Sequence, residues 1–128
     1  MFNQEQLKAI DAAIQDNLIS AGLDNVIFID MAGNTIAHHD NGKSKLDAIG
    51  FAALAAGNFA AVEAMAQMAG ESEFSLLFHR GEKSSIHLSK VTENTLLITM
   101  FNKEISLGLV RLKVADTIDT VNRILAEK

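Results

Sequence analysis

The most constraining feature of this 128-residue chain is one long segment, residues 46–70, that is apolar around nearly its whole circumference. As a helix it would be about 37 Å long. Between Ala48 and Gly70 its only charged residue is Glu63. A helix that is apolar on every side is normally buried on every side, and a single small domain has too little other surface to cover it. The segment therefore predicts contact with a second molecule.

Two sides of this helix are predicted to make different contacts. The larger residues are expected to face a sheet; they are Phe51, Leu54, Asn58, Val62 and Met65. An adjacent stripe of mostly small residues would let a second copy of the helix approach closely. The stripe consists of Gly50, Ala53, Gly57, Ala61, Ala64 and Met68. Alternatively, the alanines are simply good helix formers on a surface. Exposed helices usually also carry Lys and Glu, so the pattern favours a homodimer.

The composition excludes several classes of function. The chain has no cysteine, which rules out disulfides, thiolate metal sites and cysteine nucleophiles. A net charge of -5 argues against binding to nucleic acid or to an anionic membrane surface. The longest uncharged run, residues 48–62, is shorter than the roughly 18 apolar residues of a membrane span. With no signal sequence at the start, we expect a cytoplasmic protein.

The whole chain, residues 1–128, is predicted to form one domain with the element order α-β-β-α-β-β-β-α. Hydrophobic periodicity and turn residues place strands at 26–29, 35–38, 74–80, 85–91 and 95–101, and helices at 5–21, 45–70 and 107–125. The last three strands are separated by very short connections, which force antiparallel neighbours. We therefore expect a five-stranded antiparallel sheet between helices. The apolar run 26–29 should be buried on both of its faces.

The strand that follows the long helix offers a second route to self-association. Residues 74–78 have the sequence Phe-Ser-Leu-Leu-Phe, which is an apolar strand that could lie at the edge of the sheet. An exposed edge of this kind invites pairing with a symmetry-related copy. Phe74, Leu76 and Phe78 are therefore predicted to join the small-residue stripe in the dimer interface.

The element order, together with residues 54–58 (Leu-Ala-Ala-Gly-Asn), resembles the roadblock/dynein light chain family. The run 106–111 (Ser-Leu-Gly-Leu-Val-Arg) and the junction 70–74 are similar to the bacterial MglB-type branch of that family. The resemblance extends from Leu7 to Leu125. It implies a roadblock/longin-like fold and a homodimer in which two sheets join into one, with the two long helices side by side.

The same resemblance implies a partner protein. MglB-type proteins bind a small Ras-like GTPase and accelerate its GTP hydrolysis, while the GTPase supplies the catalytic groups. This chain would then be a regulator with no cofactor and no active site of its own. Other family members are non-catalytic scaffolds or motor light chains, which is the main alternative. A third possibility is a small nucleotide-binding protein.

The GTPase is expected to contact the outer rim of the paired long helices. That rim is predicted to consist of Ala52, Ala56, Phe59, Glu63 and Gln67. Phe59 is the candidate anchor, because a large aromatic residue among exposed alanines is typical of a binding hot spot. Alternatively, Phe59 packs against the sheet. Glu63 would lie near the symmetry axis, where it could pair with a basic group of the GTPase.

The nucleotide-binding alternative depends on the loop at residues 37–44 (Ala-His-His-Asp-Asn-Gly-Lys-Ser), which matches a relaxed phosphate-loop pattern. Asp40 puts a negative charge where phosphate would lie, and the loop lacks the glycines that let backbone N–H groups surround it. The preceding strands also form a tight hairpin and not a parallel crossover. We therefore expect an ordinary Asn-Gly turn that binds no nucleotide.

The histidines and arginines are the remaining candidates for metal ligands and catalytic groups. His38 and His39 should point to opposite faces of a strand, so they cannot easily share an ion. His79 and His87 could face each other, but no third ligand is apparent, and all four histidines are expected to be solvated. Of the three arginines, Arg80 is the best candidate for an arginine finger; the others are Arg111 and Arg123. Since the long helix has no arginine, stimulation of a GTPase would act by repositioning its switch segments.

Overall fold

The computed structural model describes residues 2–43, 45–70 and 76–126. The elements are α1 (Gln4–Ile14), a π-helical turn η1 (Gln15–Ile19), β1 (Asn25–Asp30), β2 (Thr35–Asp40), α2 (Ala48–Met68), β3 (Leu76–Arg80), β4 (Ser84–Thr92), β5 (Thr95–Asn102) and α3 (Leu107–Ala126). This order confirms the predicted one. The main difference from the predicted bounds is that α2 begins at Ala48 and not at residue 45. The Asp47 side chain caps the helix there by accepting a hydrogen bond from the Gly50 N–H (3.2 Å).

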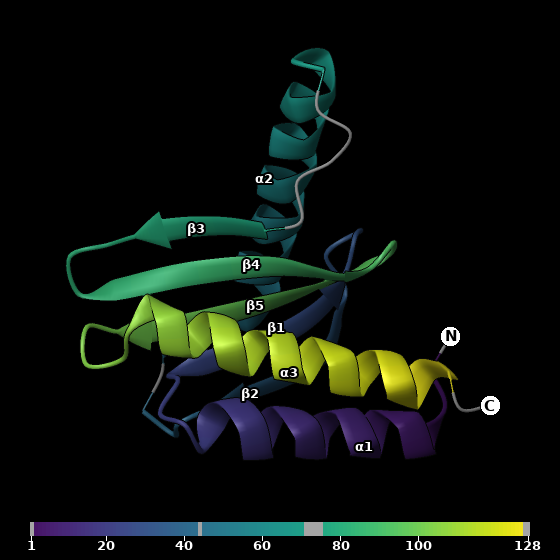
Figure 1. Cartoon of the computed structure of the whole chain (residues 1–128), viewed down its shortest axis with the longest axis vertical. Helices are drawn as coiled ribbons and strands as arrows, with labels where there is room; N and C mark the ends of the chain where they lie inside the picture. Colours follow the sequence, from purple (N-terminus) through teal and green to yellow (C-terminus); the bar gives the residue numbers. More distant parts are fainter. Residues whose placement is uncertain (1, 44, 71–75, 127–128) are drawn as a thin grey trace.

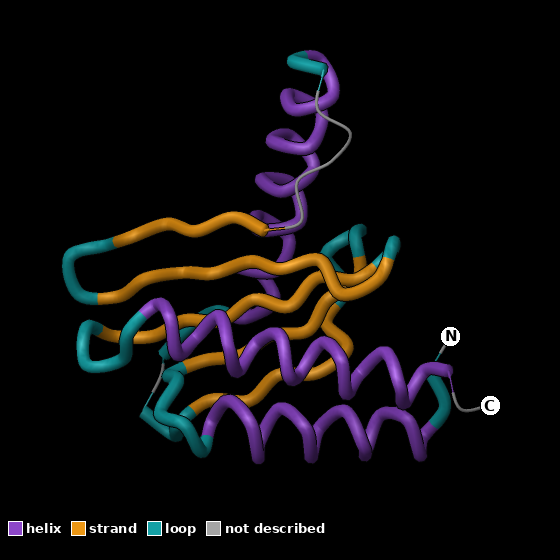
Figure 2. The backbone as a smooth tube through the Cα atoms, in the orientation of Figure 1, coloured by secondary structure: helices purple, strands orange, loops and turns teal. Residues whose placement is uncertain are grey.

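The five strands form one antiparallel sheet in the order β2-β1-β5-β4-β3. Helices α1 and α3 lie on one face of this sheet, and α2 lies on the other (Figure 1). Figure 2 shows that α1 and α3 run along the strands, whereas α2 crosses them. The predicted five-stranded sheet between helices is therefore confirmed.

The first hydrophobic core lies between the sheet and the pair α1/α3. Helical spacing puts Ile10, Ile14 and Leu18 on one stripe of the N-terminal helical segment, and all three are fully buried. Val26 and Phe28 of β1 face the same core. Ile27 and Ile29 alternate with them and face α2, so β1 is buried on both faces as its apolar run predicts.

The second core lies under α2 and differs from the predicted one. The buried residues of α2 are Ala52, Ala55, Ala56, Phe59 and Ala66. The prediction that the larger residues face the sheet is wrong, since Leu54 is 77% and Met65 65% exposed and Asn58 is also exposed, while Phe51 and Val62 are half-buried. Phe59 and the half-buried Phe51 pack against this core, and the other α2 side chains turned toward the sheet are small.

The reason for this rotation is a close backbone approach at the β1–β2 turn. Gly33, in that turn, has a φ of +92°, and a Cβ added to it would lie 3.0 Å from the Cα of Ala53. Because the helix backbone lies so near, small side chains such as Ala52 and Ala56 pack on the sheet beside this turn. The larger apolar residues are left on the outer surface.

This close approach yields a stability prediction. Gly33→Ala would meet both left-handed backbone strain and the α2 backbone, whereas Gly42→Ala meets strain alone, because nothing lies within 4 Å of its added Cβ (φ +82°). We expect Gly42→Ala to lower the free energy of unfolding by about 1–2 kcal/mol. Gly33→Ala should lower it by about 1–3 kcal/mol more, because α2 must move. Urea denaturation of both variants measures the difference, and equal losses would contradict the close approach.

Candidate functional site

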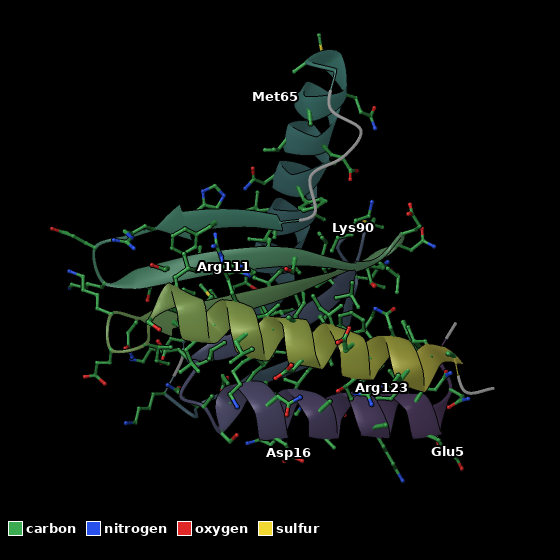
Figure 3. The ribbon with its side chains drawn as sticks, viewed as in Figure 1. Glu5, Asp16, Met65, Lys90, Arg111 and Arg123 are labelled. Atoms are coloured by element: carbon green, nitrogen blue, oxygen red, sulfur yellow. The ribbon has the colours of Figure 1, made fainter. Side chains whose placement is uncertain are left out.

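The candidate site is the outer surface of α2, which extends beyond the sheet. Helix α2 crosses the strands and continues past β3, so that none of the described strands lies beneath its C-terminal half (Figure 1). Met65 projects from this overhanging half, far from the sheet (Figure 3). The exposed large apolar residues of α2 are Ile49, Leu54, Met65 and Met68, with exposed fractions of 65–89%. A group of this kind on one helix marks an interaction surface.

The small-residue stripe lies on the side of α2 opposite to Phe59, as the helical repeat requires. Ala53, Gly57, Ala61, Ala64 and Met68 are exposed, and Gly50 at the start of the helix is half-buried. A Cβ added at Gly57 would have no neighbour within 4 Å. Within the described residues, the stripe from Gly57 to Met68 is therefore exposed and open to a close helix–helix contact.

One flank of the stripe borders a groove between α2 and the sheet edge. The groove has a volume of about 360 Å³ and is lined by Phe51, Leu54, Ala55, Asn58, His79, Ile86 and Leu88. Its lining is mostly apolar, and Asn58 Nδ2 and His79 Nε2 are hydrogen-bonded across it at 3.2 Å. The apolar surface thus continues from the helix onto the strands next to it.

The edge position predicted for the strand after α2 is confirmed. Among the described strands, β3 pairs only with β4, and its other side is open. Phe78 is half-buried and stacks on Phe101, with 6.2 Å between ring centroids. Phe74 lies outside the described residues, and Leu76 is the first residue of β3. The open edge and the α2 overhang lie next to each other.

The predicted GTPase-binding rim is wrong in its main members. Ala52, Ala56 and Phe59 face the sheet and not the solvent, and Phe59 is only 1% exposed. The alternative, that Phe59 packs against the sheet, is confirmed. Only Gln67 of the predicted set is fully exposed. The hydrophobic periodicity of α2 gave no guide to its rotation, because nearly every position is apolar or small.

Glu63 is half-buried and forms an ion pair within the chain. Its Oε2 lies 3.3 Å from Lys90 Nζ on β4, and Lys90 Nζ lies 3.8 Å from Glu93 Oε2. The pairing of Glu63 with a basic group of the GTPase stays a prediction, and in the single chain this carboxylate already pairs with Lys90. The pair ties the middle of α2 to the sheet, and no local pattern in the sequence indicates it.

By length and composition alone, α2 would be able to cross a membrane. The uncharged run 48–62 underestimated the length of the apolar helix, because the apolar character continues beyond Glu63 to Met68. In this fold, however, one side of α2 packs on the sheet, and Glu63 is paired with Lys90. Such packing is typical of a helix within a globular domain.

In the loop that resembles a phosphate loop, side-chain oxygen atoms of the loop itself accept hydrogen bonds from its backbone N–H groups. Gly42 N–H donates to Asp40 Oδ1 at 2.7 Å, and Lys43 N–H donates to Asn41 Oδ1 at 2.9 Å. The strands before it form the predicted antiparallel hairpin. The backbone N–H groups of Gly42 and Lys43 are thus occupied, and the geometry fits a turn.

His38 and His39 lie on opposite faces of β2, as predicted. His38 Nε2 lies 2.8 Å from Asn25 Oδ1, and His39 Nε2 lies 3.0 Å from Asp11 Oδ1 on α1. Within residues 2–43, 45–70 and 76–126, no three His, Asp or Glu side chains come together in a way that could hold a metal ion.

His79 and His87 do not face each other. In the β3–β4 register His87 is opposite Phe78, and His79 is opposite Ile86, which places the two histidines on opposite faces of the sheet. His79 is exposed, but the prediction of a solvated His87 is wrong, because this residue is 1% exposed. Neither ring nitrogen of His87 has a hydrogen-bond partner among the described residues. Burial, helped by the charge of Arg111, lowers the pKa of His87 below 6.5.

The lowered pKa of His87 predicts a pH dependence of stability. The unfolded chain takes up the proton near pH 6.5, while the folded protein resists it, so the unfolded state binds more protons as the pH falls. The free energy of unfolding should therefore be fully retained above pH 6.5 and fall below it, until His87 is protonated in the folded state as well. Urea denaturation between neutral and mildly acidic pH measures this loss.

The matched variant is His87→Leu, which removes the buried titrating group and fills a similar space. We expect it to be neutral or stabilising at neutral pH, because no hydrogen bond is lost, and to reduce the acid-induced loss. His38→Leu, at an exposed position, serves as the control. If His87→Leu leaves the pH profile unchanged, another group causes it.

The three arginines lie away from the outer surface of α2. The Arg80 guanidinium lies 5.9 Å from the centroid of the Phe78 ring at the end of β3. Arg111 and Arg123 are on α3, on the opposite side of the sheet from α2. Arg123 bonds within its own helix, where its Nη2 donates to Thr120 Oγ1 at 3.4 Å. The exposed surface of α2 therefore offers apolar contact and no arginine.

Comparison with known proteins gives a consistent result. The family model of the Roadblock/LC7 domain matches residues 12–101. The structure of MglB from Myxococcus xanthus is similar at a TM-score of 0.90 and 31% sequence identity, over 98% of this chain and 93% of that one. No curated protein matches the sequence significantly.

Two further solved structures are similar over nearly their full length. The gliding protein MglB from Thermus thermophilus has a TM-score of 0.88 and 25% identity, over 100% of this chain and 96% of that one. A structure described as MglB with a tetrameric arrangement has a TM-score of 0.88 and 26% identity, over 99% and 94% of the two chains. The shared fold includes the long helix that carries the candidate site.

Proposed function

The chain belongs to the Roadblock/LC7 family, and on this premise we propose that it is a homodimeric, MglB-like regulator of a small Ras-like GTPase. The observation that carries the proposal is the apolar, overhanging surface of α2 beside the open edge of β3. Such a surface is suited to binding proteins. The described part of the chain brings together no metal-binding cluster, and the phosphate-loop-like turn has no free backbone donors at Gly42 and Lys43.

The geometry supports a dimer in which the two sheets join at β3. A second copy that pairs its β3 with this β3 would extend the sheet beneath the overhanging half of α2. The overhang of each chain would then lie over the partner's sheet, and the small stripes would bring the two long helices together. One arrangement thus covers the apolar residues that the single chain leaves exposed.

The dimer is tested by Ala64→Arg. This change puts a bulky charge into the proposed helix contact, at a cost of several kcal/mol if the charge is buried without a partner. Light scattering coupled to gel filtration should show a dimer for the wild type and a monomer for the variant. Ala115→Arg is the control, because Ala115 is an exposed alanine of α3 on the other face of the sheet, and its dimer should persist.

A wild type that is monomeric at high micromolar concentration would refute the dimer. Loss of the dimer in both variants would show instead that the interface is not specific to α2.

The surface proposed for the GTPase is the flank of α2 away from the groove. Ile49 and Gln67 project from that flank, and Ile49 is 79% exposed. Ile49 therefore replaces Phe59 as the candidate anchor residue. Since α2 contains no arginine, the proposed stimulation acts through the position of the partner's switch segments and not through an inserted cation.

The GTPase-activating role is tested by single-turnover GTP hydrolysis with the small GTPase encoded nearest to this gene. Ile49→Ser should lower the stimulation about tenfold, corresponding to the loss of a hot-spot contact, without affecting the dimer. Leu112→Ser is the matched control: Leu112 is 58% exposed on α3, and its loss should have no effect. Arg80→Ala should keep most of the stimulation.

Other outcomes discriminate between the possible functions. If Arg80→Ala alone abolishes the stimulation, the protein uses an arginine finger after all. If the wild type binds the GTPase tightly without accelerating hydrolysis, it is a scaffold of the same fold. If it does not bind the GTPase, the proposed function is wrong.

A further inference from the structure

A second cavity lies on the opposite side of the sheet from α2, at the end where the β3–β4 hairpin meets the start of α3. Figure 1 shows these two segments at the same end of the molecule, away from both chain termini. The cavity has a volume of about 520 Å³. It is lined by Phe78, Arg80, Gly81, Ser85, Phe101, Asn102, Lys103, Ile105, Ser106 and Leu107. It has no part in the contacts proposed for α2.

The charge in this cavity is of one sign. Arg80 and Lys103 line it, and no Asp or Glu is among its described lining residues. Two carboxylates are near in sequence, Glu82 in the hairpin and Glu104 after β5, and both side chains are exposed and outside the lining. In the described part of the chain, no carboxylate forms an ion pair with Arg80 or Lys103. The cavity is therefore a basic site in a protein of net charge -5.

The start of α3 adds to this positive potential. Ser106 caps the helix, with its Oγ accepting the Leu109 N–H at 3.1 Å. The first turn of this 20-residue helix has no acidic residue to offset the partial positive charge of its N-terminus. Leu107, the first helical residue, lines the cavity, so the end of the helix adjoins the two cations.

The aromatic wall of the cavity has a buried histidine beside it. Phe78 and Phe101 stack on each other in this wall, and the Arg80 guanidinium lies over the Phe78 ring. His87, buried and without hydrogen bonds, is the β4 partner of Phe78. Arg111, on the N-terminal part of α3 (Figure 3), is near enough to His87 to disfavour its protonation. The cavity thus combines two lining cations and a helix N-terminus with an apolar wall.

From this combination we propose that the cavity binds a phosphate monoester with an apolar organic group. Arg80 and Lys103 would bind the phosphate oxygens, the start of α3 would face the same group, and the organic part would lie on Phe78 and Ile105. The guanidinium of Arg80 is suited to phosphate because its planar N–H groups match two oxygens at once.

The charge of the site favours phosphate over a carboxylate. Two cations and the partial charge of a helix N-terminus total more than two positive charges. A carboxylate brings one negative charge, whereas a phosphate monoester carries about 1.5 to 2 near neutral pH and presents three acceptor oxygens. The phosphate could belong to a free small molecule or to a phosphorylated side chain of a protein, and the experiment separates these sources.

The test is a titration of the full-length, isotope-labelled protein, followed by the chemical shifts of its backbone amides. Phenyl phosphate, inorganic phosphate and benzoate are the three probes. We expect phenyl phosphate to bind most tightly and to shift the amides of Arg80, Gly81, Leu107 and Gly108. Arg80→Gln and Lys103→Gln should each weaken its binding about tenfold. Lys43→Gln, beside the loop at residues 37–44, should have no effect.

Several outcomes would overturn the proposal. They are shifts confined to other parts of the protein, benzoate binding as tightly as phenyl phosphate, and equal affinity in all three variants. Arg80 and Lys103 are both exposed, so the variants should fold, and the amide spectrum verifies this. If one of them does not fold, the other still tests the site.

A short peptide with one phosphotyrosine identifies the source of the phosphate. Binding tighter than that of phenyl phosphate supports a phosphorylated protein, and equal binding supports a small molecule. The proposed GTPase function is tested separately, because Lys103→Gln lies outside α2 and should leave GTP hydrolysis by the partner unchanged.

Discussion

The packing of small residues of α2 against the sheet is the contact on which the rest of this structure depends. Gly33 lets the β1–β2 turn approach the backbone of Ala53, and small side chains such as Ala52 and Ala56 pack on the sheet beneath this part of the helix. The same contact directs Leu54 and Met65 outward. The core on this side and the exposed apolar surface are therefore two results of one rotation of the helix. A residue that enlarged the buried side of α2 would alter both.

The two faces of the sheet are covered by helices to different extents. On one face α1 and α3 cover the strands with large aliphatic residues, and that core is complete within a single chain. On the other face α2 alone covers part of the sheet and then leaves it at the β3 edge. Apolar surface without cover is costly in water, so a second chain or another protein is the natural complement of this face. The ion pair of Glu63 and Lys90 links the middle of the helix to β4 within the single chain.

The fold could be predicted from the sequence because its elements have clear periodicity and short connections. The burial of Val26 to Ile29 on both faces and the edge position of β3 followed from local pattern and strand order. The rotation of α2 could not be predicted, since a helix of alanines and large apolar residues has no polar face to orient it. The burial of Phe59 and the pairing of Glu63 depend on the β1–β2 turn and on β4, which are distant in sequence. The small stripe of α2 could be predicted from its Gly and Ala residues at three- and four-residue spacing, and the exposure of Ala53, Gly57, Ala61 and Ala64 agrees with that prediction.

Strand β3 belongs to both of the surfaces proposed for this protein. Its open edge would join a second chain, and its last residues, Phe78 and Arg80, line the basic cavity. A change in β3 would therefore affect both surfaces at once and would not separate their roles. Ile49 and Lys103 do separate them, because Ile49 lies on α2 alone and Lys103 lies in the turn between β5 and α3. If the two sites are independent, the double variant Ile49→Ser/Lys103→Gln should show the loss of GTPase stimulation of Ile49→Ser and the loss of phenyl phosphate binding of Lys103→Gln, each unchanged in size. If either loss differs in size between the double variant and the corresponding single variant, β3 transmits the state of one surface to the other.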